Sequence, residues 1–197
     1  MDIIVASNNK GKIKEIKDIF VEHNVLSLND ISLNVDVEED GNTFYENAFK
    51  KAKEIYDIVQ RPVIADDSGL CIDCFDHWPG VLTHRFLGED KNDQERNEFI
   101  IKKMKDNTQN RDCKFICCVV YYDGVNTLSY ESVLLGTIAM SEKGENGFGF
   151  DKIFLLKNFK TIAQLSSKEK NKISPRKDSL ENLSTQIFEL IRTQNII

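Results

Sequence analysis

Two consecutive aspartates, Asp66 and Asp67, follow the apolar run Val63-Ile64-Ala65 and precede Ser68-Gly69. Because an unpaired carboxylate is costly to bury, two of them at the end of a strand indicate a metal or substrate site. Mg²⁺ prefers one or two carboxylates together with phosphate oxygens and water, and the acidic stretch Glu38-Glu39-Asp40 adds candidates. The alternative is a solvated turn. Neighbouring strand side chains point to opposite faces, so we expect only one aspartate to face a given site.

A predicted strand-to-helix junction near the start of the chain could bind an anion. A helix start offers free N–H groups and the positive end of the helix dipole. The junction lacks the glycine and lysine spacing of a Walker A loop. The alternative is an ordinary capped helix with exposed lysines. The residues concerned are Ser7, Asn8, Asn9, Lys10, Gly11 and Lys12.

Two later segments have other binding chemistry. In Gly147-Phe148-Gly149-Phe150-Asp151, aromatic rings between glycines could form a stacking surface for a base, or the rings could enter the core. The stretch from Lys168 to Lys177 is dense in basic residues within an acidic protein, which favours either a local anion site or a solvated charge run. Together, the four segments predict a nucleotide hydrolase.

Composition excludes several classes of protein. The 197 residues are enough for one domain with its own core, and a net charge of −6 argues against a general nucleic-acid partner. The five cysteines have neither disulfide-framework nor zinc-site spacing, so free thiols in a reducing compartment are expected. No basic leader and no apolar stretch of membrane-spanning length is found. We therefore expect one cytoplasmic domain over residues 1–197, without a membrane partner.

The hydrophobic periodicity alternates between strand and helix along the first half of the chain. Later, two β-rich runs joined by Asp123-Gly124 predict a hairpin. This mixture predicts an α/β fold with a mixed central β-sheet flanked by helices. Strands are expected at residues 3–6, 25–28, 63–65, 70–72, 115–122, 126–140 and 153–156, and helices at 10–20, 44–59, 93–105 and 174–193.

These residues resemble the motifs of the inosine triphosphate pyrophosphatase family, enzymes that remove non-standard purine nucleotides. The matching segments follow one another in the same order over nearly the whole chain, so the resemblance is highly specific. They are Ser7-Asn8-Asn9-Lys10-Gly11-Lys12 with Glu15, residues 39–48 with Lys51-Ala52, residues 64–70, Pro79-Gly80-Val81 with Arg85-Phe86, residues 147–151, and residues 169–176.

The resemblance implies two lobes around a nucleotide-binding cleft, a homodimer, and hydrolysis of ITP, dITP and XTP to a monophosphate and pyrophosphate. It also implies Mg²⁺ as the cofactor, with Mn²⁺ as a substitute. Carried over by position, Asp67 is the catalytic carboxylate and a metal ligand with Glu39. The implied substrate contacts are Ser7, Asn8, Asn9, Lys10, Gly11, Lys12, Ser68 and Lys170 for the phosphates, Phe148, Gly149, Phe150 and Asp151 for the base and sugar, and Arg176 with its neighbour Pro175 for the base edge.

Pro175 is a departure from the family, because many members have histidine at this substrate-binding position. Proline has no side-chain donor and no N–H, so base preference stays open. Phe150 replaces a frequent tyrosine and keeps only the ring. One rival function is a pyrophosphatase for modified pyrimidine nucleotides. Another is a nucleotide- or RNA-binding module without turnover, which the added negative charge of Asp66 and Asp67 disfavours.

Overall fold

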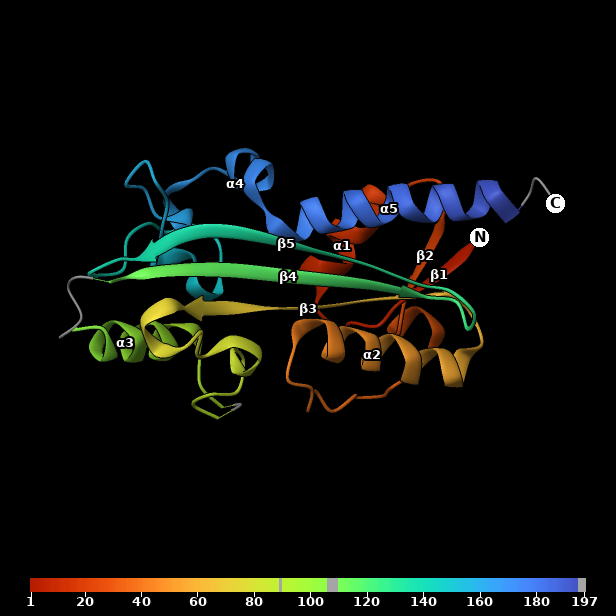
Figure 1. The fold of residues 1–197 in the computed structure, drawn as a ribbon, viewed down its shortest axis with the longest axis horizontal. Helices are drawn as coiled ribbons and strands as arrows, with labels where there is room; N and C mark the ends of the chain where they lie inside the picture. The colour runs from red at the N-terminus through yellow and green to blue at the C-terminus, as the bar shows by residue number, and fades with distance from the viewer. Residues whose placement is uncertain (89, 106–109, 195–197) are drawn as a thin grey trace. The chain divides into compact units, whose positions relative to one another are not determined.

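The computed structural model describes residues 1–88, 90–105 and 110–194 (Figure 1). Within these ranges the chain forms six strands and five α-helices. Strands and helices alternate along the first half of the chain, and two long consecutive strands follow. The strands are β1 (Asp2–Val5), β2 (Asn24–Ser27), β3 (Val63–Ile72), β4 (Asp112–Tyr122), β5 (Thr127–Ile138) and β6 (Phe154–Leu155). The helices are α1 (Lys10–Ile19), α2 (Phe44–Val59), α3 (Asp93–Lys103), α4 (Ser167–Ile173) and α5 (Pro175–Gln194).

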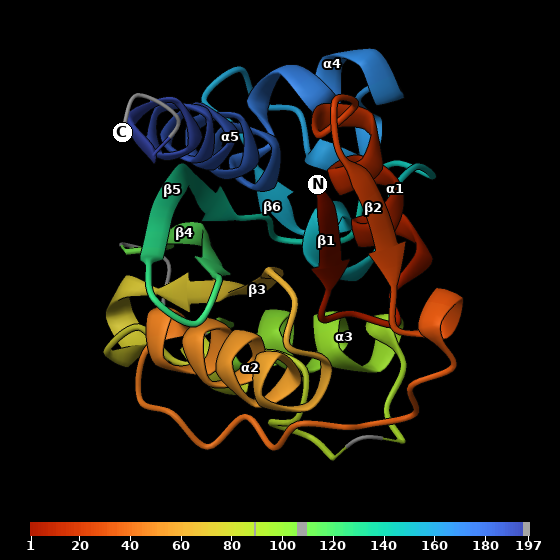
Figure 2. The same ribbon diagram turned by 90° about the vertical axis from the view of Figure 1, so that its right-hand side faces the viewer.

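The strands form one mixed sheet in the order β2-β1-β3-β4-β5-β6. Strand β1 pairs in parallel with β2 and with β3, whereas β5 pairs antiparallel with β6. Figure 2 shows β1 and β2 side by side and pointing the same way. The turn between β4 and β5 is closed by the Asp123 carboxylate, which accepts the N–H groups of Val125 and Asn126 at 3.0 and 2.7 Å. The predicted class, a mixed sheet flanked by helices, is confirmed.

The first of two compact units comprises Met1–Asp67, Cys117–Ser132 and the chain from Arg176 onward. Within it, α2 covers one face of the strands, while α1 and α5 cover the other (Figures 1 and 2). The α5 side chains of Leu180, Leu183 and Ile187 recur at helical spacing and are fully buried in its core. Burying each such side chain stabilises the fold by about 1.5–3 kcal/mol.

The second unit comprises Ser68–Ile116 and Val133–Pro175 and contains α3, α4 and β6. Its core gathers Leu70 and Ile72 from β3, Ile100 from α3 and Phe154 from β6, all nearly inaccessible to solvent. Each unit thus has its own apolar centre. That residues 1–197 act as one domain, with two lobes around a cleft, stays a prediction.

The largest correction concerns β3. We expected one strand at residues 63–65 and another at 70–72, separated by Asp66-Asp67-Ser68-Gly69, but β3 runs without a break from Val63 to Ile72 and all ten of its residues are buried. The solvated-turn alternative is therefore wrong, because the carboxylates have partners inside the protein. Helix α4 was not predicted either, although Ser166 and Glu169 form a reciprocal capping box at its start. Hydrophobic periodicity predicts that Phe99 faces inward from α3, but its side chain is 39% exposed.

All five cysteines are free, as the sequence predicted. In the described ranges, none of the helices combines the length and apolar character needed to cross a membrane.

Candidate active site

Asp66 lies on β3 with its side chain almost fully buried, and two cations contact its carboxylate. Oδ2 lies 2.8 Å from Nζ of Lys12 on α1 and 3.3 Å from Nε of Arg176 on α5. Arg176 also lies 3.5 Å from the carboxylate of Glu15. Buried charges that are multiply paired in this way hold their elements in one arrangement. Asp66 therefore joins α1 and α5 to the sheet.

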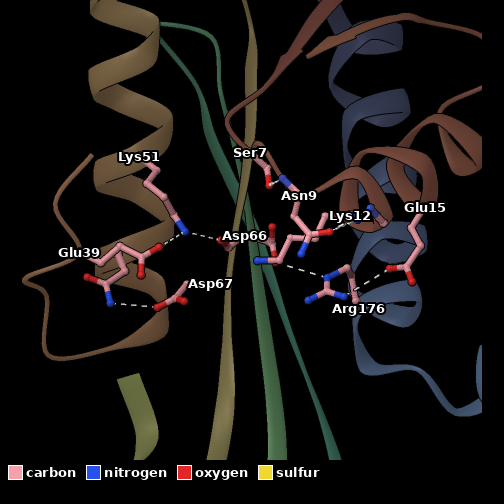
Figure 3. A network of polar contacts seen from close by, with 11 residues as sticks. Ser7, Asn9, Lys12, Glu15, Glu39, Lys51, Asp66, Asp67 and Arg176 are labelled. Atoms are coloured by element: carbon pink, nitrogen blue, oxygen red, sulfur yellow. Dashed lines mark hydrogen bonds and ion pairs between the residues drawn. The ribbon is translucent and has the colours of Figure 1, made fainter. Parts of the chain in front are cut away.

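Asp67 is also buried, and its side chain points to the opposite side of β3 from that of Asp66 (Figure 3). Its Oδ2 accepts a hydrogen bond from Nδ2 of Asn47 on α2 at 2.9 Å. The Oδ1 atom of Asn47 in turn accepts the N–H of Gly41 at 2.8 Å. One buried amide therefore links the loop before α2 to the predicted catalytic carboxylate. Strand alternation separates the two aspartates, as the sequence predicted.

Lys51 of α2 lies between β3 and the acidic loop (Figure 3). Its ammonium forms an ion pair with Glu39 and donates a hydrogen bond to the backbone carbonyl of Asp66 at 2.6 Å. Burial opposes the charged form of Lys51, but the carboxylates of Asp66, Glu39 and Asp67 outweigh it and raise its pKa. Lys51 is therefore a fixed positive charge beside both predicted metal ligands.

The pairing around Asp66 also sets the ionisation of its partners. Burial would raise the pKa of Asp66, but Lys12, Arg176 and Lys51 hold it well below its usual range. For Arg176, burial would lower the pKa, and Asp66 raises it. The cluster thus stays ionised near neutral pH, with three cations around the Asp66 carboxylate. Fixed cations of this kind can attract a polyphosphate.

The segment Ser7–Lys12 forms the start of α1, with Asn9 as its N-cap. The Asn9 side-chain oxygen accepts the N–H groups of Gly11 and Lys12 at 2.9 and 3.2 Å. The Ser7 hydroxyl oxygen accepts the N–H of Asn9 at 3.2 Å. The ordinary capped helix is therefore present. A phosphate would bind here through the side chains of the segment, or by taking the place of the Asn9 side-chain oxygen at the helix start.

In the second unit, Phe148, Asp151 and Lys170 form a cluster of their own. Asp151 accepts the N–H of Phe148 at 3.0 Å and forms an ion pair with Lys170 of α4. The Lys170 ammonium lies 4.4 Å from the centroid of the Phe148 ring, a cation–π distance. Phe148 is nevertheless 61% exposed, so most of its ring remains accessible. The cluster is suited to stack on a planar group.

Three other predicted substrate contacts lie in the interior. Phe150 is 7% exposed and packs in the core of the second unit, so the two phenylalanines of this loop have different environments. Ser68 is buried on β3. Pro175 is buried as the first residue of α5, where a missing N–H has no helical cost. The roles predicted for all three stay predictions.

Sequence reasoning missed Asn47 and Lys51, although both belong to the matched helix segment. They are four residues apart on α2, so they lie on one face of the helix. That face also carries Phe44, Ala48 and Ala52, all buried. Polar residues on an otherwise apolar helix face need buried partners, and this signal was available in the sequence.

The donor set of Glu39 and Asp67 fits Mg²⁺. Both residues offer only carboxylate oxygens, the hard ligands that this ion prefers. Within the described residues there is no cluster of three or more histidine, cysteine or acidic side chains that could hold a metal by itself. A bound ion would thus need further oxygens from substrate and water, which is how Mg²⁺ is held in most phosphate-processing sites.

Solved structures share this fold over almost the entire chain. A Ham1 protein from Staphylococcus aureus matches with a TM-score of 0.89 and 37% identity, covering 96% of this chain and 98% of that one. A HAM1 protein from Coxiella burnetii matches with a TM-score of 0.90 and 34% identity, covering 96% and 99%.

The sequence itself gives the family. The Ham1 family model matches residues 3–186, and the chain belongs to this family. Among curated relatives, the dITP/XTP pyrophosphatase of Bacillus subtilis is 43% identical over 93% of this chain and 95% of its own length. The dITP/XTP pyrophosphatase of Clostridium tetani is 39% identical over 96% and 97%.

Proposed function

We propose that this chain hydrolyses non-standard purine nucleoside triphosphates, namely dITP, XTP and ITP, to the nucleoside monophosphate and pyrophosphate. Two relatives that align with nearly all of the chain have the name dITP/XTP pyrophosphatase. The observation that carries the proposal is the buried Asp67 carboxylate, held by Asn47. Several fixed cations lie on the elements around it. A carboxylate and fixed cations are the groups that phosphoanhydride hydrolysis requires.

In this proposal Asp67 orients a water molecule for attack on the α-phosphorus and accepts its proton. The bond from the α-phosphorus to the bridging oxygen breaks, and pyrophosphate leaves. Lys12 and the Ser7–Gly11 segment bind the phosphates, and their positive charge stabilises the negative charge that develops. No covalent intermediate is needed. Ser68 and Lys170 are proposed as further phosphate contacts.

Glu39 and Asp67 are the residues that would hold Mg²⁺, with Mn²⁺ as a substitute. When bound, the ion would neutralise phosphate charge and polarise the phosphoryl group. Lys51, which pairs with Glu39, orients this carboxylate next to β3. Asn47 performs the corresponding task for Asp67.

The base is proposed to contact Phe148, Gly149, Phe150 and Asp151, with Arg176 and Pro175 at its edge. The exposed ring of Phe148 supports a stacking role. Because Arg176 is already paired with Asp66, its role at the base would be added to an anchoring role. We further propose that the chain acts as one domain, as a homodimer and in the cytoplasm. Light scattering of the purified protein tests the dimer, with a monomer mass as the contrary result.

A substrate panel with Mg²⁺ tests the proposed function. We expect kcat/KM for ITP, dITP and XTP to exceed that for ATP and GTP by at least about tenfold, the discrimination expected when polar groups read a base. Rates on dUTP and methylated dTTP separate this proposal from a pyrimidine pyrophosphatase. Higher kcat/KM for a pyrimidine nucleotide than for ITP would contradict the proposal, as would tight ITP binding without turnover.

A further inference from the structure

The loop that carries Phe148 is held by helix α3. The Gly149 N–H donates a hydrogen bond to Oδ2 of Asp93 at 2.6 Å. The Gly149 carbonyl accepts one from Nδ2 of Asn97 at 3.1 Å. Asp93 and Asn97 are four residues apart on α3, so both side chains project from one face of the helix. One glycine is thereby fixed through both its donor and its acceptor.

On the other side of Phe148, Gly147 leaves no space for a larger residue. Gly147 has φ of 81°, and a Cβ at this position would lie 1.9 Å from Oδ2 of Asp151. At Gly149, with φ of 59°, a Cβ would meet nothing within 4 Å. The Phe148 backbone therefore runs between two fixed glycines, while the space beside Gly149 is open. The backbone is thus restrained on both sides of Phe148, and the Lys170 ammonium lies 4.4 Å from the centroid of its ring.

Asn97 is a buried amide whose hydrogen-bonding capacity is only partly satisfied. It is 1% exposed, and its Nδ2 also donates to Oε1 of Glu142 at 2.8 Å. Its Oδ1 is buried without a hydrogen-bond partner among the described residues. A buried acceptor without a partner destabilises a fold, and an apolar side chain would avoid this. The Asn97 amide nevertheless donates two hydrogen bonds, and one of them fixes the Gly149 carbonyl.

We infer that Asp93 and Asn97 are positioning residues that set the Phe148 ring for stacking on the purine base. They act through the Gly149 peptide and touch no substrate themselves. This inference rests on the proposed role of Phe148 in base binding. Their loss therefore weakens binding of the base and discrimination between bases, while kcat, which depends on the first unit's carboxylates, is retained.

These variants distinguish the loss of a hydrogen bond from a change in side-chain volume. Asp93→Asn keeps an acceptor for the Gly149 N–H, whereas Asp93→Leu removes it. Asn97→Asp replaces the two donated bonds by a carboxylate facing the Gly149 carbonyl and Glu142. Glu98→Gln and Gln94→Leu are matched controls, because Gln94 and Glu98 also form an i, i+4 pair on α3, at 2.8 Å. Asp93 is exposed, so Asp93→Leu keeps the test usable if Asn97→Asp fails to fold.

Steady-state kinetics on ITP and inhibition by inosine monophosphate and pyrophosphate are the readouts. We expect Asp93→Leu and Asn97→Asp to raise KM for ITP about tenfold, the scale of one lost base-stacking contact. We also expect kcat within about twofold of the parent. Inhibition by inosine monophosphate weakens and inhibition by pyrophosphate does not. Asp93→Asn and both control variants stay close to the parent chain.

Phe148→Ala tests the base contact itself, separately from the positioning of that contact by Asp93 and Asn97. Unchanged KM for ITP in this variant would remove the proposed role of Phe148 itself. A raised KM in Phe148→Ala together with unchanged KM in Asp93→Leu and Asn97→Asp would overturn only the positioning role. Equal weakening of inosine monophosphate and pyrophosphate would also overturn it, because positioning of the base contact leaves the phosphate contacts intact.

Discussion

Asn47 donates a hydrogen bond to Asp67 across 2.9 Å, and both side chains are buried. The same amide accepts the N–H of Gly41, two residues after the predicted metal ligand Glu39. Through Asn47, helix α2 therefore positions the Asp67 carboxylate and also holds the loop that carries Glu39. Asn47 therefore provides a direct test of the site. Replacing its side-chain nitrogen by an oxygen, as in Asn47→Asp, turns the hydrogen bond to Asp67 into a repulsion between two carboxylates.

Asn47→Asp should lower kcat by at least about tenfold, because the new carboxylate repels Asp67 and loses the donated hydrogen bond. Steady-state assays with ITP give the result. Asn158→Asp is the matched control, since Asn158 is exposed and uses only its oxygen, as acceptor for the Lys160 N–H. If Asn47→Asp were as active as the control, the positioning role of Asn47 would be wrong.

Asp67→Asn should lower the turnover rate by at least about 10²-fold, the usual scale for removing a positioned base. Its melting temperature should stay near that of the parent, because the amide fits the same space. Near-normal turnover would move the catalytic role to another residue.

Asp66→Asn should lower the free energy of unfolding, in contrast to Asp67→Asn, because Asp66 neutralises the buried cations Lys12 and Arg176. Removing one partner of a buried ion pair costs about 3–5 kcal/mol. Urea unfolding of both variants measures the contrast. Equal stability of Asp66→Asn and the parent would show that the pairing does not support the fold.

Chelation of divalent ions should abolish hydrolysis, and added Mg²⁺ or Mn²⁺ should restore it. For Glu39→Gln, we expect the Mg²⁺ concentration at half-maximal rate to rise about tenfold, as for loss of one of two carboxylate ligands. Glu38→Gln, at the exposed neighbouring position, is the control. Full turnover in excess chelator would contradict the metal requirement.

The cysteines provide a test of the packing. Burial, with help from nearby carboxylates, raises the pKa of Cys117 and of Cys118 to about 12, and burial raises that of Cys113 still further. At pH 8, well below these values, the three thiols are protonated and unreactive. Cys71 is buried as well, whereas Cys74 is only half-buried.

A thiol reagent at pH 8 should therefore label Cys74 first in the native protein and all five cysteines after denaturation. Cys74→Ser should remove the fast phase. Fast labelling of two or more sites in the native chain would show that the cores are looser than described.

Motif and charge predict Asp67, Glu39 and Lys12 as site residues, and their roles remain predictions. The sequence does not predict the path of β3 through this segment. The local residues Asp66-Asp67-Ser68-Gly69 are typical of a turn, and only their buried partners show that they belong to a strand. The partners lie on three helices that are far from β3 in the sequence or separated from it by a turn, namely Lys12 on α1, Asn47 on α2 and Arg176 on α5. The different environments of Phe148 and Phe150 depend on which ring meets the apolar core, and a pair of similar residues gives no local signal of this.

Hydrolysis of ITP in ¹⁸O-labelled water with Mg²⁺ tests the central claim most directly. Attack of water on the α-phosphorus predicts one labelled oxygen in inosine monophosphate and none in pyrophosphate, with the two products in equal amounts. Label in pyrophosphate would place the attack on the β-phosphorus, and release of inosine diphosphate with orthophosphate would contradict the pyrophosphatase account altogether.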